Sequence, residues 1–190
     1  MIRAVAAALV VFVGVRAAHA DLPKGPLWTY LRHTAAIRQG VGRTRLYVFF
    51  DANCPYCHDL YEALQPLIRR KGLGVRWVPV GILALSSYGK AAALLEAADP
   101  AAALARMERG FHDGRGAVRP ARATARVAHG LRYNVRLFEA SGAEGVPFLV
   151  FRTRDGRVHT IEGDPPYAAL AQIVGSITDS SRSTPEMAAP

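Results

Sequence analysis

The stretch Tyr47–His58, YVFFDANCPYCH, contains both cysteines of the chain and lies where the spacing of apolar residues changes. Residues 46–50, LYVFF, form a short run of aromatic, aliphatic and β-branched side chains, which is typical of a buried strand. Beyond the first cysteine the apolar residues fall three and four apart, as on one face of a helix: Cys57, Leu60, Leu64, Leu67 and Ile68. The stretch therefore predicts a strand that leads directly into a helix at the two cysteines.

The predicted helix has recognisable signals at both ends. Pro55 suits the first turn, because an N–H there would have no partner within the helix. The basic residues 69–71 followed by Gly72 are typical of a helix C-terminus. The cysteines then lie at the helix N-terminus, where free backbone N–H groups and the helix dipole stabilise a thiolate. We expect Cys54 to be exposed and to be the nucleophile, with Cys57 covered by the core.

The first twenty residues differ in composition from the rest of the chain. Arg3, an apolar run over residues 4–15 and the triplet Ala18-His19-Ala20 predict a secretory signal peptide, residues 1–20, cleaved after Ala20. The apolar run is short for a membrane span, which favours a cleaved signal over a membrane anchor. We therefore expect an exported protein located in the periplasm.

Length and charge limit the remaining possibilities. The chain has 190 residues and is 51% hydrophobic, which is enough for one well-buried domain and too little for two large ones. Loss of the signal peptide removes Arg3 and Arg16 and lowers the formal net charge from +9 to +7. The arginines are scattered, without a dense run or interleaved aromatic residues, so we expect no nucleic-acid partner.

Export places the two cysteines in an oxidising compartment. A disulfide between residues three apart closes a very small loop and restricts the unfolded chain little, so the pair suits redox chemistry better than structural cross-linking. A binding module or holdase with an incidental C-x-x-C is an alternative, suggested by the alanine-rich helical segment and the basic surface. An Ala/Leu helix pattern is, however, more typical of a core helix.

The cysteines also match C-x-x-C-H, the attachment motif of c-type haem. A haem protein would need His58 and usually a second axial ligand, for which Met107 and Met187 are the methionine candidates. Haem attachment would not explain the strand before the motif or the late hairpin. A zinc site would need a second Cys/His pair at ligand spacing, and the sequence contains no such pair. We therefore expect neither a cofactor nor a metal.

The rest of the chain predicts a mixed order of strands and helices. The expected strands are residues 75–83, 148–152 and 157–161, and the expected helices are residues 86–98, 99–110, 121–140 and 164–174. Pro79 places the first of these strands, a parallel partner of residues 46–50, at a sheet edge or a bulge. Asp99 caps the second helix, Gly130 breaks the third, and Asp155-Gly156 forms a hairpin turn between the last two strands.

This order predicts an α/β protein with the thioredoxin fold. A helical insertion at about residues 84–141 separates the βαβ unit from the C-terminal ββα unit. The domain is expected at residues 43–177, after a short docking segment with at most one helix at residues 21–42 and before a flexible tail at residues 178–190.

Five sequence features together resemble the catalytic domain of the DsbC/DsbG group of periplasmic disulfide isomerases. The first feature is the motif CPYC, which directly follows a strand ending in FFDAN. The other four are the segments VRWVPVGIL and GKAAALLEAADPAAAL, the triplet GVP and the hairpin RDGRV, and all five lie within residues 43–175. The resemblance implies a DsbG-like thiol:disulfide oxidoreductase that uses Cys54 and Cys57 on cysteine-containing exported proteins. It also implies that Pro147 is a cis-proline against the disulfide and that Val146 contacts the bound substrate.

The chain departs from those isomerases at two points. The segment of residues 21–42 is too short to supply their N-terminal dimerisation domain, so we expect a monomer. Val146 stands where they usually have threonine, and a valine there resembles the DsbA-type oxidases. The redox direction therefore stays open between a reductase or isomerase served by a DsbD-like membrane reductant and an oxidase served by a DsbB-like oxidant.

Other residues near the cysteines have weaker signals. Tyr56, between the cysteines, either shapes the substrate site or only packs against the fold. Val48 stands where thioredoxins have a buried aspartate, so this strand offers no built-in proton acceptor. We expect His58 to be a surface histidine of the first helical turn, and Asp51 and Asn53 to position the loop without a catalytic role.

Overall fold

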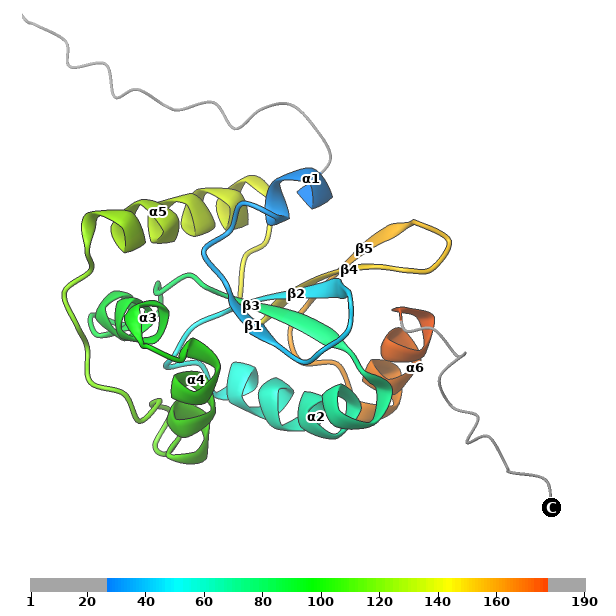
Figure 1. Cartoon of the computed structure of the whole chain (residues 1–190), viewed down its shortest axis with the longest axis horizontal. Helices are drawn as coiled ribbons and strands as arrows, with labels where there is room; N and C mark the ends of the chain where they lie inside the picture. Colours follow the sequence, from blue (N-terminus) through cyan, green and yellow to red (C-terminus); the bar gives the residue numbers. More distant parts are fainter. Residues whose placement is uncertain (1–26, 178–190) are drawn as a thin grey trace, which may run out of the picture.

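The computed structural model of the protein describes residues 27–177 (Figure 1). The predicted signal peptide, residues 21–26 of the docking segment and the predicted tail from residue 178 lie outside the described residues. None of the helices within residues 27–177 is long and apolar enough to cross a membrane.

A five-stranded mixed sheet forms the centre of the structure. Its strands are β1 (Ile37–Gln39), β2 (Thr44–Phe50), β3 (Gly74–Pro79), β4 (Phe148–Arg152) and β5 (Val158–Glu162). They follow the spatial order β1-β3-β2-β4-β5, in which β2 and β3 run parallel and the other neighbouring pairs are antiparallel. The predicted hairpin of the last two strands is confirmed. β2 lies in the middle of the sheet and leads into the cysteine motif.

Helices cover both faces of the sheet. They are α1 (Leu27–Leu31), α2 (Pro55–Lys71), α3 (Ser87–Glu96), α4 (Pro100–Arg109), α5 (Ala125–Ala140) and α6 (Tyr167–Ile177). In Figure 1, α2 and α6 lie on one side of the sheet, and α1 and α5 lie on the other. Because α3, α4 and α5 are inserted between β3 and β4, the expected thioredoxin order with a helical insertion is confirmed.

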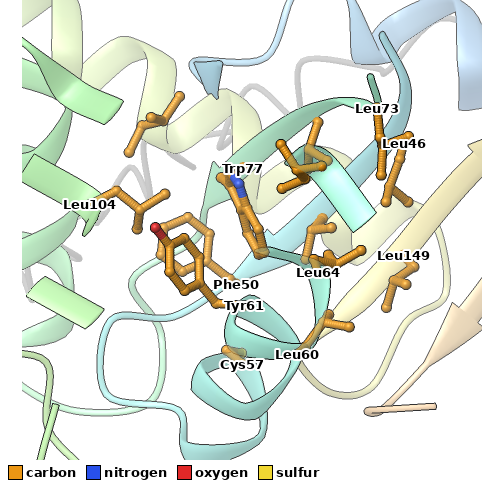
Figure 2. Packing of buried hydrophobic residues seen from close by; sticks show 14 of the residues in the cluster. Leu46, Phe50, Cys57, Leu60, Tyr61, Leu64, Leu73, Trp77, Leu104 and Leu149 are labelled. Atoms are coloured by element: carbon orange, nitrogen blue, oxygen red, sulfur yellow. The ribbon is translucent and has the colours of Figure 1, made fainter. Parts of the chain in front are cut away.

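β2 is buried on both faces, which explains its continuous apolar sequence. Leu46, Val48 and Phe50 belong to a core cluster that includes residues of α2, α4 and α6. Tyr47 and Phe49 belong to a second cluster with residues of α1 and α5. Figure 2 shows part of the first cluster, in which the apolar face of α2 packs against the sheet. The start of α2 is therefore held firmly at the end of β2.

β1 lies in the segment where the sequence predicts at most a helix. It pairs antiparallel with residues 75–77, which places β3 inside the sheet between β1 and β2. The expectation that Pro79 marks a sheet edge or a bulge is therefore wrong, because β3 is an inner strand and its pairing with β2 is regular at Pro79. Pro79 lies beyond the residues that pair with β1, at the end of β3, where its missing N–H removes no hydrogen bond to β1.

Three helix boundaries test the sequence signals. α5 continues through Gly130, so the expected break is wrong. A Cβ atom on Gly130 would lie 2.6 Å from the Cβ of Ala35, so the glycine allows α5 to pack closely on the segment after α1. Asp99 caps α4 as predicted, since its carboxylate accepts the N–H of Ala102 at 2.9 Å. α6 begins later than expected, at Tyr167.

Candidate active site

The two cysteines lie where β2 ends and α2 begins. Cys54 is the N-cap of α2, in an extended conformation, and its sulfur accepts the backbone N–H of Cys57 at 3.1 Å. Pro55 is the first helical residue, and Gly72 ends the helix in the left-handed conformation, with a φ of 61°. Both predicted helix ends are confirmed. The Cys54 sulfur therefore lies where the helix N-terminus offers unpaired N–H donors.

Both cysteines are buried, with only 2% of each residue exposed. The expectation of an exposed Cys54 is wrong, because its thiol packs against the segment that precedes β4 and donates a hydrogen bond to the Val146 carbonyl at 3.5 Å. The exposed part of the motif is Pro55 and Tyr56, and Tyr56 is 66% exposed. Any group that is to reach the Cys54 sulfur must therefore displace the contact with Val146.

Hydrogen bonding and burial make the two thiols chemically different. Both cysteines are free thiols in the structure. A hydrogen bond from the Cys57 thiol holds the pKa of Cys54 below its ordinary value. Burial raises the pKa of Cys57 well above its ordinary value, and hydrogen bonding with the Cys54 sulfur raises it further. Cys54 is therefore the thiol that ionises first, as the position at the helix N-terminus predicts.

The peptide bond between Val146 and Pro147 is cis, as predicted. Pro147 is buried directly before β4, and its carbonyl accepts the N–H of Gly163 at 2.8 Å. Val146 is partly buried and packs against both core clusters. The fold therefore brings Val146 to the Cys54 sulfur, although 92 positions separate them in the sequence.

A buried carboxylate next to the motif holds the loop that follows β3. The Asp51 side chain accepts hydrogen bonds at 2.6–3.0 Å from the backbone N–H groups of Asn53, Ile82 and Leu83 and from the Ser87 hydroxyl. These bonds fix the turn before Cys54 against the start of α3. The expectation that Asp51 positions the loop is therefore confirmed, and its partners Ile82, Leu83 and Ser87, in the loop before α3 and at the start of that helix, are an addition that sequence reasoning does not provide.

Lys90 is a buried cation that sequence reasoning misses. Its ammonium donates hydrogen bonds to the side-chain carbonyl of Asn53 and to the Gly116 carbonyl, both at 2.7 Å. Asn53 in turn donates from its amide to the hydroxyls of Ser86 and Ser87, at 3.1 and 2.8 Å. Burial lowers the pKa of Lys90. The one available signal is a lysine within the apolar part of the helix sequence SYGKAAALLE.

His58 is not the surface residue that the sequence predicts. Its Nδ1 atom lies 2.8 Å from Oε2 of Glu108, and its ring stacks on Phe111 with centroids 4.5 Å apart. Glu108 comes from α4, is 3% exposed, and has its pKa raised to about 7 by burial. The insertion therefore covers the His58 side of the first turn of α2 and places the Glu108 carboxyl against it, a contact that has no local signal in the sequence.

The geometry of the described residues bears on the haem and metal alternatives. Within residues 27–177, no group of three or more His, Cys, Asp and Glu side chains is arranged to hold a metal ion. The His58 ring already contacts Glu108 and Phe111, and Met107 is buried in the first core cluster. Met187 lies outside the described residues. These contacts favour a packed helix over haem ligation at this motif.

Comparison with known proteins supports the interpretation of Cys54 and Cys57 as a redox-active pair. Residues 31–177 match the family of the thioredoxin-like domain. The chain is 32% identical over 168 residues to the thiol:disulfide interchange protein DsbG of Pseudomonas aeruginosa, which covers 84% of this chain and 62% of that protein. It is 27% identical over 131 residues to DsbG of Escherichia coli, covering 69% of this chain and 52% of that protein. The chain thus spans between half and two thirds of the length of these relatives.

A solved structure shows the same fold. The crystal structure of a periplasmic thioredoxin-like protein from Salmonella enterica serovar Typhimurium superposes with a TM-score of 0.65 at 22% identity. The match covers 82% of this chain and 97% of that chain. At this level of identity the similarity concerns the arrangement of the backbone.

Proposed function

This chain belongs to the thioredoxin-like domain family, and from that premise we propose that it is a thiol:disulfide oxidoreductase that acts on cysteine-containing exported proteins. The observation that carries the proposal is the Cys54 sulfur at the N-cap of α2, with its lowered pKa and with Cys57 as its hydrogen-bond partner. A thiolate at a helix N-terminus is the reactive form of cysteine in disulfide exchange. The similarity to DsbG of Pseudomonas aeruginosa supports the same chemistry.

In the reaction, Cys54 is the nucleophile and Cys57 the resolving thiol. The Cys54 thiolate attacks one sulfur of a partner disulfide, forms a mixed disulfide and releases the other partner sulfur. Cys57 then attacks the Cys54 sulfur, and the bond between Cys54 and the partner breaks. The Cys57 proton passes to the departing partner thiolate, because burial makes Cys57 a weak acid. The partner gains two electrons and the chain gains a disulfide. The same steps in reverse order oxidise a partner dithiol.

Val146, Pro147 and Tyr56 are the proposed substrate contacts. The Val146 carbonyl accepts a hydrogen bond from the Cys54 S–H group, and this bond is lost when Cys54 ionises or enters a mixed disulfide. The carbonyl is then free to accept a backbone N–H of an extended partner segment, which would place that segment directly beside the reacting sulfur. Pro147 is buried beside this position and Tyr56 is exposed between the cysteines, so Tyr56 offers an aromatic surface to the same partner.

The redox direction distinguishes two versions of this function. A lowered Cys54 pKa stabilises the reduced pair and favours a dithiol oxidase, in which a DsbB-like protein would restore the disulfide. A DsbD-like reductant would instead keep the pair reduced for reduction or isomerisation. The experiment is the redox potential of the Cys54/Cys57 pair in glutathione buffers. A potential near about −120 mV supports the oxidase, and one near about −270 mV supports the reductase.

Activity assays test the function itself. We expect the wild-type protein to reduce insulin or to oxidise a reduced peptide, and Cys54→Ser to abolish both reactions. Full activity of Cys54→Ser would overturn the proposal and favour a binding module.

Export and oligomeric state are further parts of the proposal. Residues 1–20 support transport to the periplasm with cleavage after Ala20. N-terminal sequencing of the protein from a periplasmic fraction should find Asp21 as the first residue, and sedimentation should find a monomer. An intact signal sequence in that fraction, or a stable dimer, would contradict the corresponding part.

A further inference from the structure

A cavity of about 320 Å³ lies at the end of the sheet that is remote from the cysteines. It is lined by Trp28, Arg43, Arg45, Arg152, Arg154 and Gly156. The arginines come from the start of β2 and from the end of β4 with its hairpin turn, and the tryptophan comes from α1. In Figure 1 this hairpin projects away from the start of α2. β2 has seven residues, so the cavity lies roughly 20 Å from the cysteines and does not belong to the redox site.

Two of the arginines are held in place by backbone carbonyls. Arg45 donates from Nη1 to the Thr153 carbonyl at 3.3 Å, and Arg152 donates from Nε to the Gly156 carbonyl at 3.0 Å. A guanidinium group has five N–H donors, so each of these side chains retains donors for another partner. The hairpin thus fixes two guanidinium groups at the wall of the cavity before any ligand arrives.

The cavity has a high positive charge for its size. Its lining contains four arginines and, among the described residues, no carboxylate. The nearest acidic residue in the sequence, Asp155, accepts hydrogen bonds from the Thr153 hydroxyl and the Arg157 N–H, and it lines a neighbouring hollow. Like charges gathered in this way repel one another, so an anion that contacts several of them is bound favourably.

We propose that this cavity binds a phosphate-bearing anion. Guanidinium groups match phosphate oxygens with paired hydrogen bonds, and Arg43, Arg45 and Arg152 together carry more positive charge than one phosphate would neutralise. The volume is at the lower end of the range for small-molecule sites and leaves room for more than one phosphate group. Trp28 adds an aromatic wall next to the arginines. A free diphosphate and the headgroup of an anionic phospholipid share this chemistry.

The test uses the full-length mature protein with two probes. Isothermal titration calorimetry measures binding of inorganic pyrophosphate, and flotation measures binding to phosphatidylglycerol vesicles against phosphatidylcholine vesicles. Arg45→Gln/Arg152→Gln should weaken binding at least tenfold. The matched control Arg119→Gln/Arg122→Gln removes the same charge from two exposed residues outside the cavity and should weaken it far less.

The results distinguish a free ligand from a lipid headgroup, and they also show whether the proposal is wrong. Tight pyrophosphate binding without vesicle binding supports a free ligand, and selective binding to phosphatidylglycerol vesicles alone supports a lipid headgroup. An equal loss of binding affinity in both double variants, or no binding of either probe at low salt, would overturn the proposal. Because Arg45 and Arg152 also hold the hairpin, Arg43→Glu is the second variant, since Arg43 is exposed and its reversal should weaken binding without unfolding the protein.

Discussion

The ammonium of Lys90 lies 2.7 Å from the side-chain carbonyl of Asn53, the residue that precedes Cys54. A second 2.7 Å bond joins the same ammonium to the Gly116 carbonyl, and the Gly116 N–H lies 2.8 Å from the Ala52 carbonyl. Both α3 and the loop before α5 therefore hold the turn that carries the proposed nucleophile. The helical insertion is a support for the active-site turn as well as an apolar layer.

The first prediction concerns Lys90→Met, which removes the buried cation but keeps a long apolar side chain. Asn53 and the Gly116 carbonyl then lose a donor inside the protein, so the free energy of unfolding should fall by about 1–3 kcal/mol. Urea unfolding followed by circular dichroism measures the change. The control Arg122→Met removes a charge from an exposed residue and should change stability by less than about 0.5 kcal/mol. Equal stability of the two variants would show that the Lys90 contacts are not stabilising.

The second prediction assigns the two cysteines. Cys57→Ser removes the resolving thiol, so mixed disulfides between Cys54 and partner proteins should accumulate. Non-reducing gels of periplasmic extracts, with free thiols blocked at lysis, measure these species. Cys54→Ser is the matched control and should trap none, because the Cys57 thiol is buried and its pKa is raised. Trapping only with Cys54→Ser would reverse the roles of the two cysteines.

The third prediction follows from the raised pKa of Glu108. Its pKa is about 7 in the folded protein against an ordinary value of 4.5, so the folded state retains a proton that the unfolded state releases. This contribution to stability is fully present below about pH 4.5 and is lost as the pH rises to about 7. Glu108→Gln cannot ionise and should therefore gain stability relative to the wild type over this range, by about 2–3 kcal/mol.

Urea unfolding of both proteins between pH 4.5 and pH 8 checks this dependence. His58, which contacts Glu108, and Glu62, whose charge acts on it, are present in both proteins. A difference between the two proteins that is independent of pH would show that Glu108 does not titrate in this range.

The fold was predictable where its signals are local. The apolar run of β2, Pro55 at the start of α2 and Gly72 at its end are read from neighbouring residues, as is the Asp99 cap. β1 has only three residues and depends on pairing with β3 some forty positions later, so it has no local signature. Gly130 was misread for the same reason, because its role depends on contact with Ala35.

The candidate site divides in the same way. Cys54 and Cys57 are evident from their spacing, and Pro147 follows from the resemblance to a known family. The burial of Cys54 depends on Val146, 92 positions away, and Glu108 reaches His58 from 50 positions away. Such contacts are a property of the folded chain. Propensity and periodicity describe one element at a time and cannot reveal them.

The fourth prediction tests the close packing of α5. Gly130→Ala improves helix propensity by about 1 kcal/mol, but its Cβ would lie 2.6 Å from the Cβ of Ala35. The helix or the segment after α1 must move, so we expect a net loss of stability of about 1–3 kcal/mol. Gly175→Ala in α6 is the matched control, because no residue in the described range 27–177 packs within 4 Å of its added Cβ, and it should stabilise by about 0.5–1 kcal/mol. Thermal unfolding of both variants measures the difference, and stabilisation by Gly130→Ala would contradict the packing argument.

The fifth prediction concerns the residue that distinguishes this chain from the isomerases it resembles. Val146 packs against the core cluster that contains Cys54, and its carbonyl accepts the Cys54 thiol at 3.5 Å. Val146→Thr keeps the shape of the side chain and adds a hydroxyl donor next to the sulfur. A hydrogen bond to the thiolate should lower the Cys54 pKa further, because it stabilises the charged form. The reduced pair is stabilised by the same free energy at neutral pH, so the redox potential should rise by roughly 30 mV for each 1.4 kcal/mol.

The ultraviolet absorbance of the thiolate against pH measures the Cys54 pKa, and equilibration with glutathione measures the potential. Val146→Ala is the control, because it removes side-chain packing without adding a donor. If alanine and threonine shift both quantities equally, packing at this position sets the Cys54 pKa and the hydroxyl has no part in it. If threonine alone lowers the pKa and raises the potential, then the valine of this chain makes its cysteine pair less oxidising than a threonine would. In that case the potential of the wild-type protein depends chiefly on the helix N-terminus and on Cys57.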